Sequence, residues 1–338
     1  MNIRKTVFAF AATGVLALGV AACGDDDDAG SSGSSGADAE AGAADAAAAA
    51  PSDLSGSIAI DGSSTVEPFA QAAAELIGEN SPDLEITVGA AGTSGGFEKF
   101  CAGEIQISDA SRAIEPEEEA LCKEGGVEYT EVQVANDGIA IVTNPAVEIS
   151  CLTTDQLAQL WTDDTVTNYS ELGDDAETGE PLPDVDVSLY GPGTDSGTFD
   201  YFTEEINGEE GVSRKEYTPS EDDNVLVEGV SGDEAGLAYF GFSYYEQNQD
   251  ALNLVSVDAG DGCVEPTPDT IQSGEYAPLA RPLFMYPSTE TLGTPEGEGF
   301  MQFVVDSYSG IAEAALIVPM DETQAADAKS NLESALGT

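Results

Sequence analysis

The chain has no histidine among its 338 residues, and this absence removes several kinds of catalytic site at once. A Ser-His-Asp triad and a Cys-His pair need an imidazole as general base, and most zinc sites need one as a ligand. A serine nucleophile would have to use lysine, but no lysine beyond residue 23 stands in a Ser-x-x-Lys motif. Those lysines are Lys99, Lys123, Lys215 and Lys329.

Positive charge is also scarce, with 9 Lys and Arg against 65 Asp and Glu and a formal net charge of −56. Nucleic-acid binding is excluded because it needs a basic surface. We interpret the acidic excess as a means of staying soluble in salty surroundings, where counterions screen the self-repulsion. The alternative is binding of many cations, but the chain contains no calcium loop of the DxDxDG type. We therefore expect no metal and no cofactor.

Cysteine is rare as well, and the first of the five, Cys23, belongs to the N-terminal segment. The other four form an even number, which in an exported protein favours two disulfides. Three pairings are possible. We favour Cys101–Cys122, which closes a short local loop, and Cys151–Cys263, which joins two distant segments of one domain. A metal site is the rival interpretation, although CxxC spacing and histidine are both missing.

The first 23 residues are typical of an export signal. Arg4 and Lys5 supply a positive start, and the apolar residues 6–20 are too short to span a membrane as a stable helix. The run Val20-Ala21-Ala22-Cys23 resembles a bacterial lipobox, which implies cleavage before Cys23 and lipid attachment to its thiol. Ordinary secretion is the alternative. Residues 24–54 are acidic and of low complexity, so we predict a disordered tether there.

Strand-like and helix-like segments alternate along the rest of the chain. Strands are predicted at 57–61, 85–88, 105–108, 132–143 and 185–190, and helices or covering segments at 65–79, 97–102, 115–122, 153–160, 198–206, 299–308 and 312–317. This alternation predicts an α/β architecture with parallel strands. Ligands of such sheets bind at the carboxyl ends of strands, beside the starts of helices.

Three stretches rich in glycine and hydroxyl residues stand where a predicted strand gives way to a helix. They are Gly62-Ser63-Ser64-Thr65-Val66, Gly92-Thr93-Ser94-Gly95-Gly96-Phe97 and Gly193-Thr194-Asp195-Ser196-Gly197-Thr198-Phe199. The first turn of a helix has unpaired N–H groups and a partial positive charge, which attract anions. Helix capping alone explains any one stretch. Three in one chain favour a site for a small tetrahedral oxyanion, built mostly from neutral dipoles.

Further motifs accompany these turns in a consistent order over residues 56–320. They are Ser108-Asp109-Ala110-Ser111-Arg112, Asn136-Asp137-Gly138-Ile139-Ala140, Cys151-Leu152-Thr153 and Ala280-Arg281-Pro282-Leu283. Together the set resembles the phosphate-binding lipoproteins of bacterial high-affinity phosphate ABC transporters. The resemblance implies a type II periplasmic-binding-protein fold, in which two α/β lobes are joined by two crossover segments and enclose the ligand. We place lobe 1 at residues 55–137 and 285–338, and lobe 2 at residues 138–284.

The resemblance also implies which neutral groups hold the anion. The expected donors are Ser64 and Thr65 of lobe 1, with Thr93 and Ser94 beside them, and Ser196, Gly197 and Thr198 of lobe 2. Capping is again the alternative role for each of these residues.

The mature chain has only three arginines, so each one is considered separately. Arg112 follows Ser111 in a loop before a helix, and we expect both residues to bind the anion, because the planar fork of donors of Arg112 fits a tetrahedral oxyanion. An ion pair on the surface is the alternative role. We interpret Arg281 as structural and expect Arg214, in a polar stretch, to be exposed.

One carboxylate is expected to select phosphate over sulfate. Phosphate near neutral pH retains a proton that a carboxylate can accept, whereas the same carboxylate repels fully ionised sulfate. Asp137 is our choice for this acceptor, with Asp109 and Asp195 as rivals. Glu67 is a departure from the family, which often has an aromatic residue there. We expect its carboxylate to point outward.

The function expected is binding of inorganic phosphate outside the cytoplasmic membrane and its delivery to the permease subunits of an ABC transporter. The protein would be a monomer, attached to the outer face of the membrane through a lipid on Cys23. Two alternatives remain open. One is a binding protein for sulfate, molybdate or a phosphonate, and the other is a secreted hydrolase of phosphoesters, although we do not expect an enzyme.

Overall fold

The structure is a computed structural model that describes residues 46, 49–194, 196–220 and 222–337. The predicted export signal, the lipidation site Cys23 and most of the predicted tether lie outside the described residues, and so does Asp195. Among the described residues, no helix has both the length and the apolar character needed to cross a membrane.

The end of the predicted tether is attached to the folded chain. Ser81 Oγ donates to the carbonyl oxygen of Pro51 at 2.8 Å and accepts from Leu54 N–H at 3.1 Å. The side chain of Ala50 joins the apolar core of lobe 1. The ordered chain therefore begins by residue 50, because Ser81 satisfies backbone groups that a disordered tether would leave to water.

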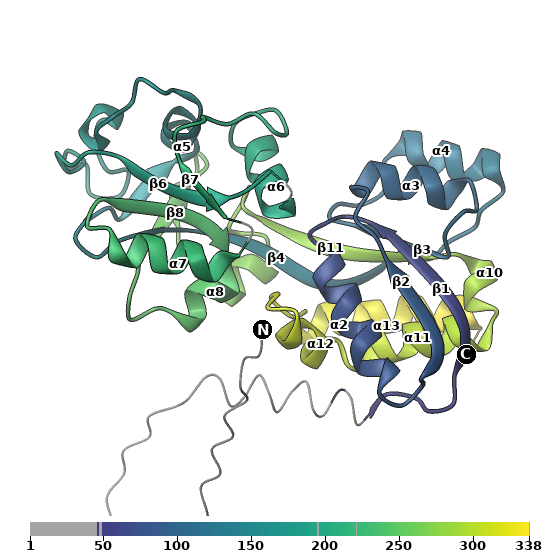
Figure 1. Ribbon diagram of the computed structural model, residues 1–338. Helices are drawn as coiled ribbons and strands as arrows, with labels where there is room; N and C mark the ends of the chain where they lie inside the picture. The colour runs from purple at the N-terminus through teal and green to yellow at the C-terminus, as the bar shows by residue number, and fades with distance from the viewer. Residues whose placement is uncertain (1–45, 47–48, 195, 221, 338) are drawn as a thin grey trace, which may run out of the picture. The chain divides into compact units, whose positions relative to one another are not determined.

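The elements of lobe 1 come from both ends of the chain. In order they are β1 (Ser55–Gly62), α2 (Glu67–Gly78), β2 (Asp83–Val88), α3 (Thr93–Cys101), β3 (Ile107–Ala110), α4 (Pro116–Gly125), α10 (Thr289–Leu292), α11 (Pro295–Asp306), α12 (Tyr308–Ala314) and α13 (Glu322–Leu336). Strand β1 pairs in parallel with β2 and β3. Helices α2 and α11–α13 cover one face of these strands, and α3 and α4 cover the other (Figure 1).

Lobe 2 is built from the middle of the chain. Its elements are β5 (Cys151–Thr153), α5 (Thr154–Thr162), a 3₁₀ turn (Tyr169–Leu172), β6 (Ser188–Pro192), α6 (Gly197–Glu205), β7 (Thr218–Ser220), α7 (Asp223–Gly232), β8 (Gly236–Gly241), α8 (Phe242–Gln247), β9 (Asn253–Asp258), β10 (Cys263–Val264) and α9 (Pro268–Gln272). Strand β6 pairs in parallel with β7 and β8. Arg214, expected to be exposed, is buried here and donates to the carbonyl oxygens of Leu160 and Val166.

Two long strands connect the lobes. Strand β4 (Val132–Thr143) begins in the core of lobe 1 and ends in the core of lobe 2, and β11 (Ala280–Pro287) returns beside it. They pair with each other antiparallel, and through them the strand order runs β2-β1-β3-β11-β4-β8-β6-β7 (Figure 1). Parallel pairing, which we expected throughout, holds for β1–β2 and β1–β3 in lobe 1 and for β5–β9, β6–β7 and β6–β8 in lobe 2. Strands β9 and β10 pair antiparallel, and so do the crossover strands with their neighbours, so the whole arrangement is mixed. Strands β4 and β11 pair antiparallel because β4 carries the chain from lobe 1 into lobe 2 and β11 carries it back.

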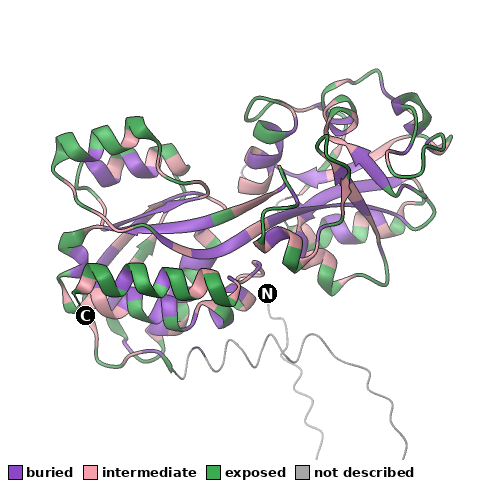
Figure 2. Cartoon of the chain, turned by 180° about the vertical axis from the view of Figure 1, so that it is seen from behind, coloured by how far each residue is buried: buried purple, intermediate pink, exposed green. Residues whose placement is uncertain are grey.

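Most of the buried apolar side chains gather in two large cores, one on each side of the crossover. One contains residues between Ile139 and Leu279 together with Val318, and the other contains residues up to Ala135 and again from Leu283 onward. Figure 2 shows the crossover strands as largely buried ribbon running between the two. The lobe boundaries at 137/138 and 284/285 stay a prediction.

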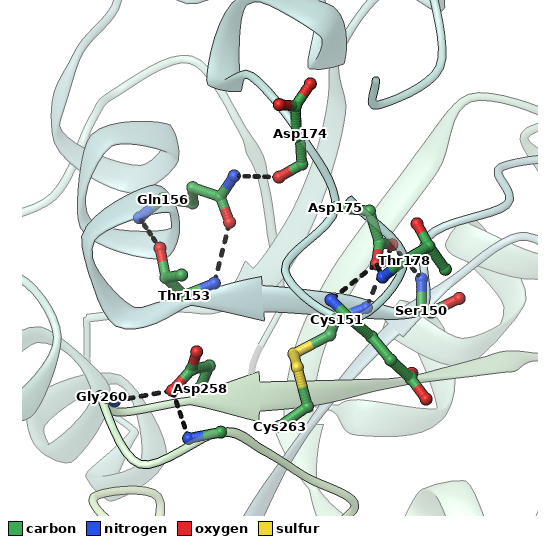
Figure 3. The surroundings of a disulfide bond; sticks show 12 residues. Ser150, Cys151, Thr153, Gln156, Asp174, Asp175, Thr178, Asp258, Gly260 and Cys263 are labelled. Atoms are coloured by element: carbon green, nitrogen blue, oxygen red, sulfur yellow. Dashed lines mark hydrogen bonds between the residues drawn. A yellow bond between two sulfur atoms is a disulfide. The ribbon is translucent and has the colours of Figure 1, made fainter. Parts of the chain in front are cut away.

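Both predicted disulfides are confirmed. Cys101 at the end of α3 is bonded to Cys122 of α4, and Cys151 of β5 is bonded to Cys263 of β10. Beside the second bond, Asp175 accepts hydrogen bonds from the backbone N–H groups of Ser150 and Cys151 (Figure 3). This carboxylate satisfies the backbone where the chain enters β5 and so fixes the segment that carries Cys151.

Candidate functional site

A cleft of about 650 Å³ is lined by residues from both lobes and from the crossover. Its lining includes the starts of α2, α3 and α6, the loop after β3, and β11. Of the ten expected phosphate ligands, seven line it: Ser64, Thr65, Thr93, Ser94, Ser111, Arg112 and Gly197. A second cavity of about 690 Å³, beside β1, α4 and α10, is lined by none of them. The sequence motifs therefore meet at one place in the fold.

The first turn is shaped by a close approach of β1 to β3. Gly62 has φ 146°, and a Cβ there would lie 2.1 Å from the carbonyl oxygen of Asp109, so only glycine fits. That same carbonyl accepts from Ser63 N–H at 2.9 Å. Ser63 Oγ in turn accepts from Thr65 N–H at 3.2 Å. These contacts hold Ser64 and Thr65 at the edge of the cleft, at the start of α2.

The second turn is attached to the loop after β3. Thr93 Oγ1 lies 3.2 Å from Ser111 Oγ and accepts from Ser111 N–H at 3.3 Å. Ser94 Oγ accepts from Arg112 Nη2 at 3.0 Å and keeps its own O–H free to donate. The first turn of α3 has N–H groups without an intrahelical acceptor, as every helix start has. Lobe 1 thus offers hydroxyl and N–H donors from three adjacent segments.

The third turn brings lobe 2 against lobe 1. Ser196 caps α6, and its Oγ accepts from Thr198 N–H at 3.2 Å. Gly197 lines the cleft and lies so near to lobe 1 that a Cβ would be 2.4 Å from Ser64 Oγ. Ser196 and Thr198 do not line the cleft, so of this trio Gly197 alone reaches it directly.

Arg112 lines the cleft, but its charge is already compensated. Two of its nitrogens each lie 2.8 Å from an oxygen of Glu118, in a bidentate pair. The hydrogen bond to Glu118 raises the pKa of Arg112, so the guanidinium stays charged. Glu118 also accepts from Glu115 N–H at the start of α4. The alternative role weighed for Arg112, an ion pair, is therefore present, and the residue connects α4 to Ser94.

Arg281, which we interpreted as structural, lines the cleft from the crossover strand β11. Its Nη2 donates to Thr65 Oγ1 at 2.6 Å, and its Nε lies 3.4 Å from Asp137 Oδ2. Its Cζ lies 3.5 Å from the ring centroid of Tyr201 in α6. One guanidinium therefore touches lobe 1, lobe 2 and the crossover strand β4, and only 12% of its side chain is exposed.

Asp137, our choice for the proton acceptor, does not line the cleft. It stands directly opposite Arg281 in the β4–β11 ladder, and its carboxylate is held by that residue. Burial raises the pKa of Asp137, and the Arg281 charge opposes this effect. The carboxylate thus orients the arginine, and the acceptor role passes in our proposal to one of its rivals.

Asp109 has the properties of an acceptor without a partner. Its side chain is completely buried, and neither carboxylate oxygen has a hydrogen-bond partner among the described residues. Burial raises the pKa of Asp109 well above its usual value, and the charges of Asp61 and Glu67 add to this. The residue does not itself line the cleft, but its neighbours Ser63 and Ser111 do. An unpaired buried carboxylate costs free energy, so the fold needs a reason to retain it.

Glu67 behaves as expected. Its Oε1 accepts from Gln71 Nε2 at 2.8 Å on the outer side of α2, and the residue does not line the cleft. Acidic side chains do line the rim, and the site is not basic as a whole. They are Glu115, Asp200, Glu204, Glu205 and Glu210. Burial and the charge of Glu204 raise the pKa of Glu205.

Comparison with known proteins decides the family. A family profile described as PBP superfamily domain matches residues 42–307. The chain is 40% identical over 277 residues to protein SphX of Synechocystis sp., covering 80% of this chain and 81% of that protein. It is 34% identical to the phosphate-binding protein PstS of Staphylococcus saprophyticus, with 83% and 86% covered. This chain belongs to the PBP superfamily.

Solved structures of PBP proteins agree with the fold. A protein of Planctomyces limnophilus, described as a possible phosphate binding protein, matches with a TM-score of 0.76 at 41% identity, covering 84% of this chain and 99% of that one. A phosphate ABC transporter substrate-binding protein of Clostridium perfringens with bound phosphate matches with a TM-score of 0.55 at 28% identity, covering 79% and 100%. The resemblance and the fold class stated from the motifs are confirmed.

Proposed function

We propose that this protein binds inorganic phosphate outside the cytoplasm and delivers it to the permease subunits of an ABC transporter. The supporting observation is the meeting of three helix starts, a set of hydroxyls and the guanidinium groups of Arg112 and Arg281 at a single cleft. Helix starts and hydroxyls suit a tetrahedral oxyanion because they offer donors in several directions at fixed positions. The relatives named as phosphate-binding proteins favour phosphate among the oxyanions.

Each part of the cleft has its own task in this proposal. Ser64, Thr65, Thr93, Ser94 and Ser111 donate from lobe 1, and Gly197 donates its N–H from the start of α6 in lobe 2. Ser196 and Thr198 shape that start. Arg281 supplies the positive charge, and Asp137 fixes its orientation through the 3.4 Å contact. Arg112 holds the start of α3 in position and lies at the cleft edge.

Asp109 is the acceptor for the phosphate proton in this proposal. A bound phosphate with its proton gives the buried carboxylate the hydrogen bond that it lacks among the described residues. Sulfate has no proton to offer near neutral pH, so the Asp109 carboxylate would stay without a hydrogen bond and would repel the anion. Selection between the two anions then depends on one proton.

The same proposal covers the oligomeric state, the membrane attachment and the absence of catalysis. The protein acts as a monomer without a cofactor, is attached by a lipid on Cys23 to the outer face of the membrane, and catalyses no reaction. A phosphatase assay with added divalent metals tests the alternative of a hydrolase directly.

Calorimetric titration of the phosphate-free protein with phosphate and then sulfate tests the proposal. We expect tight one-to-one binding of phosphate and no response to sulfate. Asp109→Asn should reduce the difference in affinity between phosphate and sulfate, because an amide can donate a hydrogen bond to sulfate. Asp250→Asn, at an exposed position, is the matched control and should leave this difference unchanged. Binding of sulfate or molybdate in place of phosphate would change the substrate, and no heat with any oxyanion would refute the function.

A further inference from the structure

Asp61 is the last side chain of β1 before the first anion-binding turn. Its Oδ1 accepts from Gly62 N–H at 2.9 Å and from Ala91 N–H at 2.9 Å. Gly62 begins the turn that carries Ser64 and Thr65, and Ala91 lies two residues before Thr93. One carboxylate oxygen therefore joins the two loops that supply the donors of lobe 1.

The loop before α3 wraps closely around this carboxylate. A Cβ at Gly89 would lie 2.9 Å from the carboxyl carbon of Asp61, so the backbone is in contact with it. Only 15% of the Asp61 side chain is exposed. The carboxylate is thus a fixed part of the loops and is not a solvated surface group.

A carboxylate in this place presents an electrostatic problem for an anion site. Ala91, whose N–H it binds, and Ser63, which follows Gly62, both line the cleft, so the negative charge of Asp61 lies behind the lining. Lys99 of α3 compensates this charge, since its Nζ donates to Asp61 Oδ2. Burial opposes ionisation of Asp61, but Lys99 and the two N–H groups outweigh it and lower the pKa. The carboxylate is therefore ionised at neutral pH, with its charge compensated by one lysine.

We propose that Asp61 is the positioning residue of the lobe 1 half-site and that Lys99 cancels its charge so that the anion is not repelled. This inference rests on the proposed binding of phosphate. The two residues act differently. Asp61 works through its hydrogen bonds, which an asparagine can also accept, whereas Lys99 works through its charge. A salt bridge that only stabilised the fold would make both residues equally important.

Phosphate affinity of four variants separates these roles. Lys99→Met leaves the Asp61 charge uncompensated and should weaken phosphate binding on the order of tenfold at low salt, with a smaller loss at high salt. Lys99→Arg keeps the charge and should bind normally. Asp61→Asn keeps the acceptor and should bind within about threefold of the unchanged protein or more tightly. The double variant Asp61→Asn with Lys99→Met should recover most of the affinity lost in Lys99→Met.

Lys329→Met is the matched control, because Lys329 also pairs with an aspartate, Asp306, at 2.7 Å, but does so on the outer surface of α13. It changes the net charge equally and should leave affinity unchanged. Melting temperatures show that each variant is folded, which is expected since 42% of the Lys99 side chain is exposed.

The outcomes distinguish a failure of the roles given to Asp61 and Lys99 from a failure of the proposed phosphate binding. If the unchanged protein binds phosphate and Lys99→Met binds equally well, or if the double variant stays as weak as Lys99→Met, the roles given to Asp61 and Lys99 are wrong. If the unchanged protein does not bind phosphate at all, the proposed function is wrong and this inference is overturned with it.

Discussion

Replacement of Gly197 by alanine separates the affinity for ligand from the stability of the fold. A Cβ at this position would lie 2.4 Å from Ser64 Oγ and 2.8 Å from Thr65 N. An ordinary contact begins at 3.4 Å, which exceeds these distances by 1.0 and 0.6 Å. The serine side chain can rotate away, but the Thr65 backbone is held by Ser63 and cannot. The approach of α6 to α2 must therefore widen.

The same substitution should not destabilise lobe 2 itself. Gly197 is the first residue of α6, where alanine favours the helical conformation over glycine by about 0.5–1 kcal/mol. Overpacking of the contact between the lobes should cost about 1–3 kcal/mol of binding free energy. This corresponds to a roughly 5- to 150-fold rise in the Kd for phosphate, accompanied by an unchanged or higher melting temperature.

Calorimetry and thermal unfolding of Gly197→Ala measure the two effects in parallel. Gly232→Ala is the control, because Gly232 is also helical, in α7, and a Cβ there would meet nothing within 4 Å. Equal phosphate affinity in the two variants would refute the reasoning. A loss of affinity that is accompanied by an equivalent loss of stability would refute it as well, since the contact would then serve the fold rather than the ligand.

Three further predictions concern charge. Arg281→Met should weaken phosphate binding by about 2–3 kcal/mol in calorimetry, because a charge-assisted contact is lost. Arg112→Met should weaken it less, because Glu118 holds two nitrogens of Arg112 at 2.8 Å, whereas Asp137 makes one contact of 3.4 Å with Arg281. Equal losses of affinity would contradict this reasoning. Asp109→Asn should raise the melting temperature of the ligand-free protein at neutral pH. A carboxyl whose folded pKa is raised loses stability as pH rises from about 4 toward that value, so the gain should shrink in acid, and a gain independent of pH would count against burial as its cause. Association with phosphate in stopped-flow should become faster with added salt, because screening weakens the repulsion by an acidic rim and a chain of charge −56; a steady decrease in rate would exclude it.

Features that depend on local chemistry could be predicted from the sequence. The three glycine–hydroxyl turns lie at helix starts because glycine permits the close approach of backbones and a hydroxyl satisfies a first-turn N–H group. The strand at 132–143 is found with the same bounds in β4. Helix α13 was missed although its start carries a capping box of Asp321 and Gln324, a signal that could have found it.

Features that depend on distant pairing could not be predicted. Arg281 and Asp137 are 144 positions apart and meet only because β4 and β11 pair antiparallel in one register. A single sequence does not give that register, so it predicts separate roles for the two residues, structural for Arg281 and ligand binding for Asp137, and does not show that they form a pair. The same limit applies to Asp109, because a single sequence does not show that its carboxylate is buried without a hydrogen-bond partner among the described residues.

The cations around the cleft explain how so acidic a chain can hold an anion. Arg281 is paired with Asp137, Arg112 with Glu118 and Lys99 with Asp61. Each pair is close to neutral, so it adds little long-range attraction, and its positive member keeps hydrogen-bond donors at a fixed position. Binding then depends on short-range contacts from N–H groups, hydroxyls and one oriented guanidinium, which salt screens much less than a diffuse basic surface. A site of this kind needs neither histidine nor net positive charge.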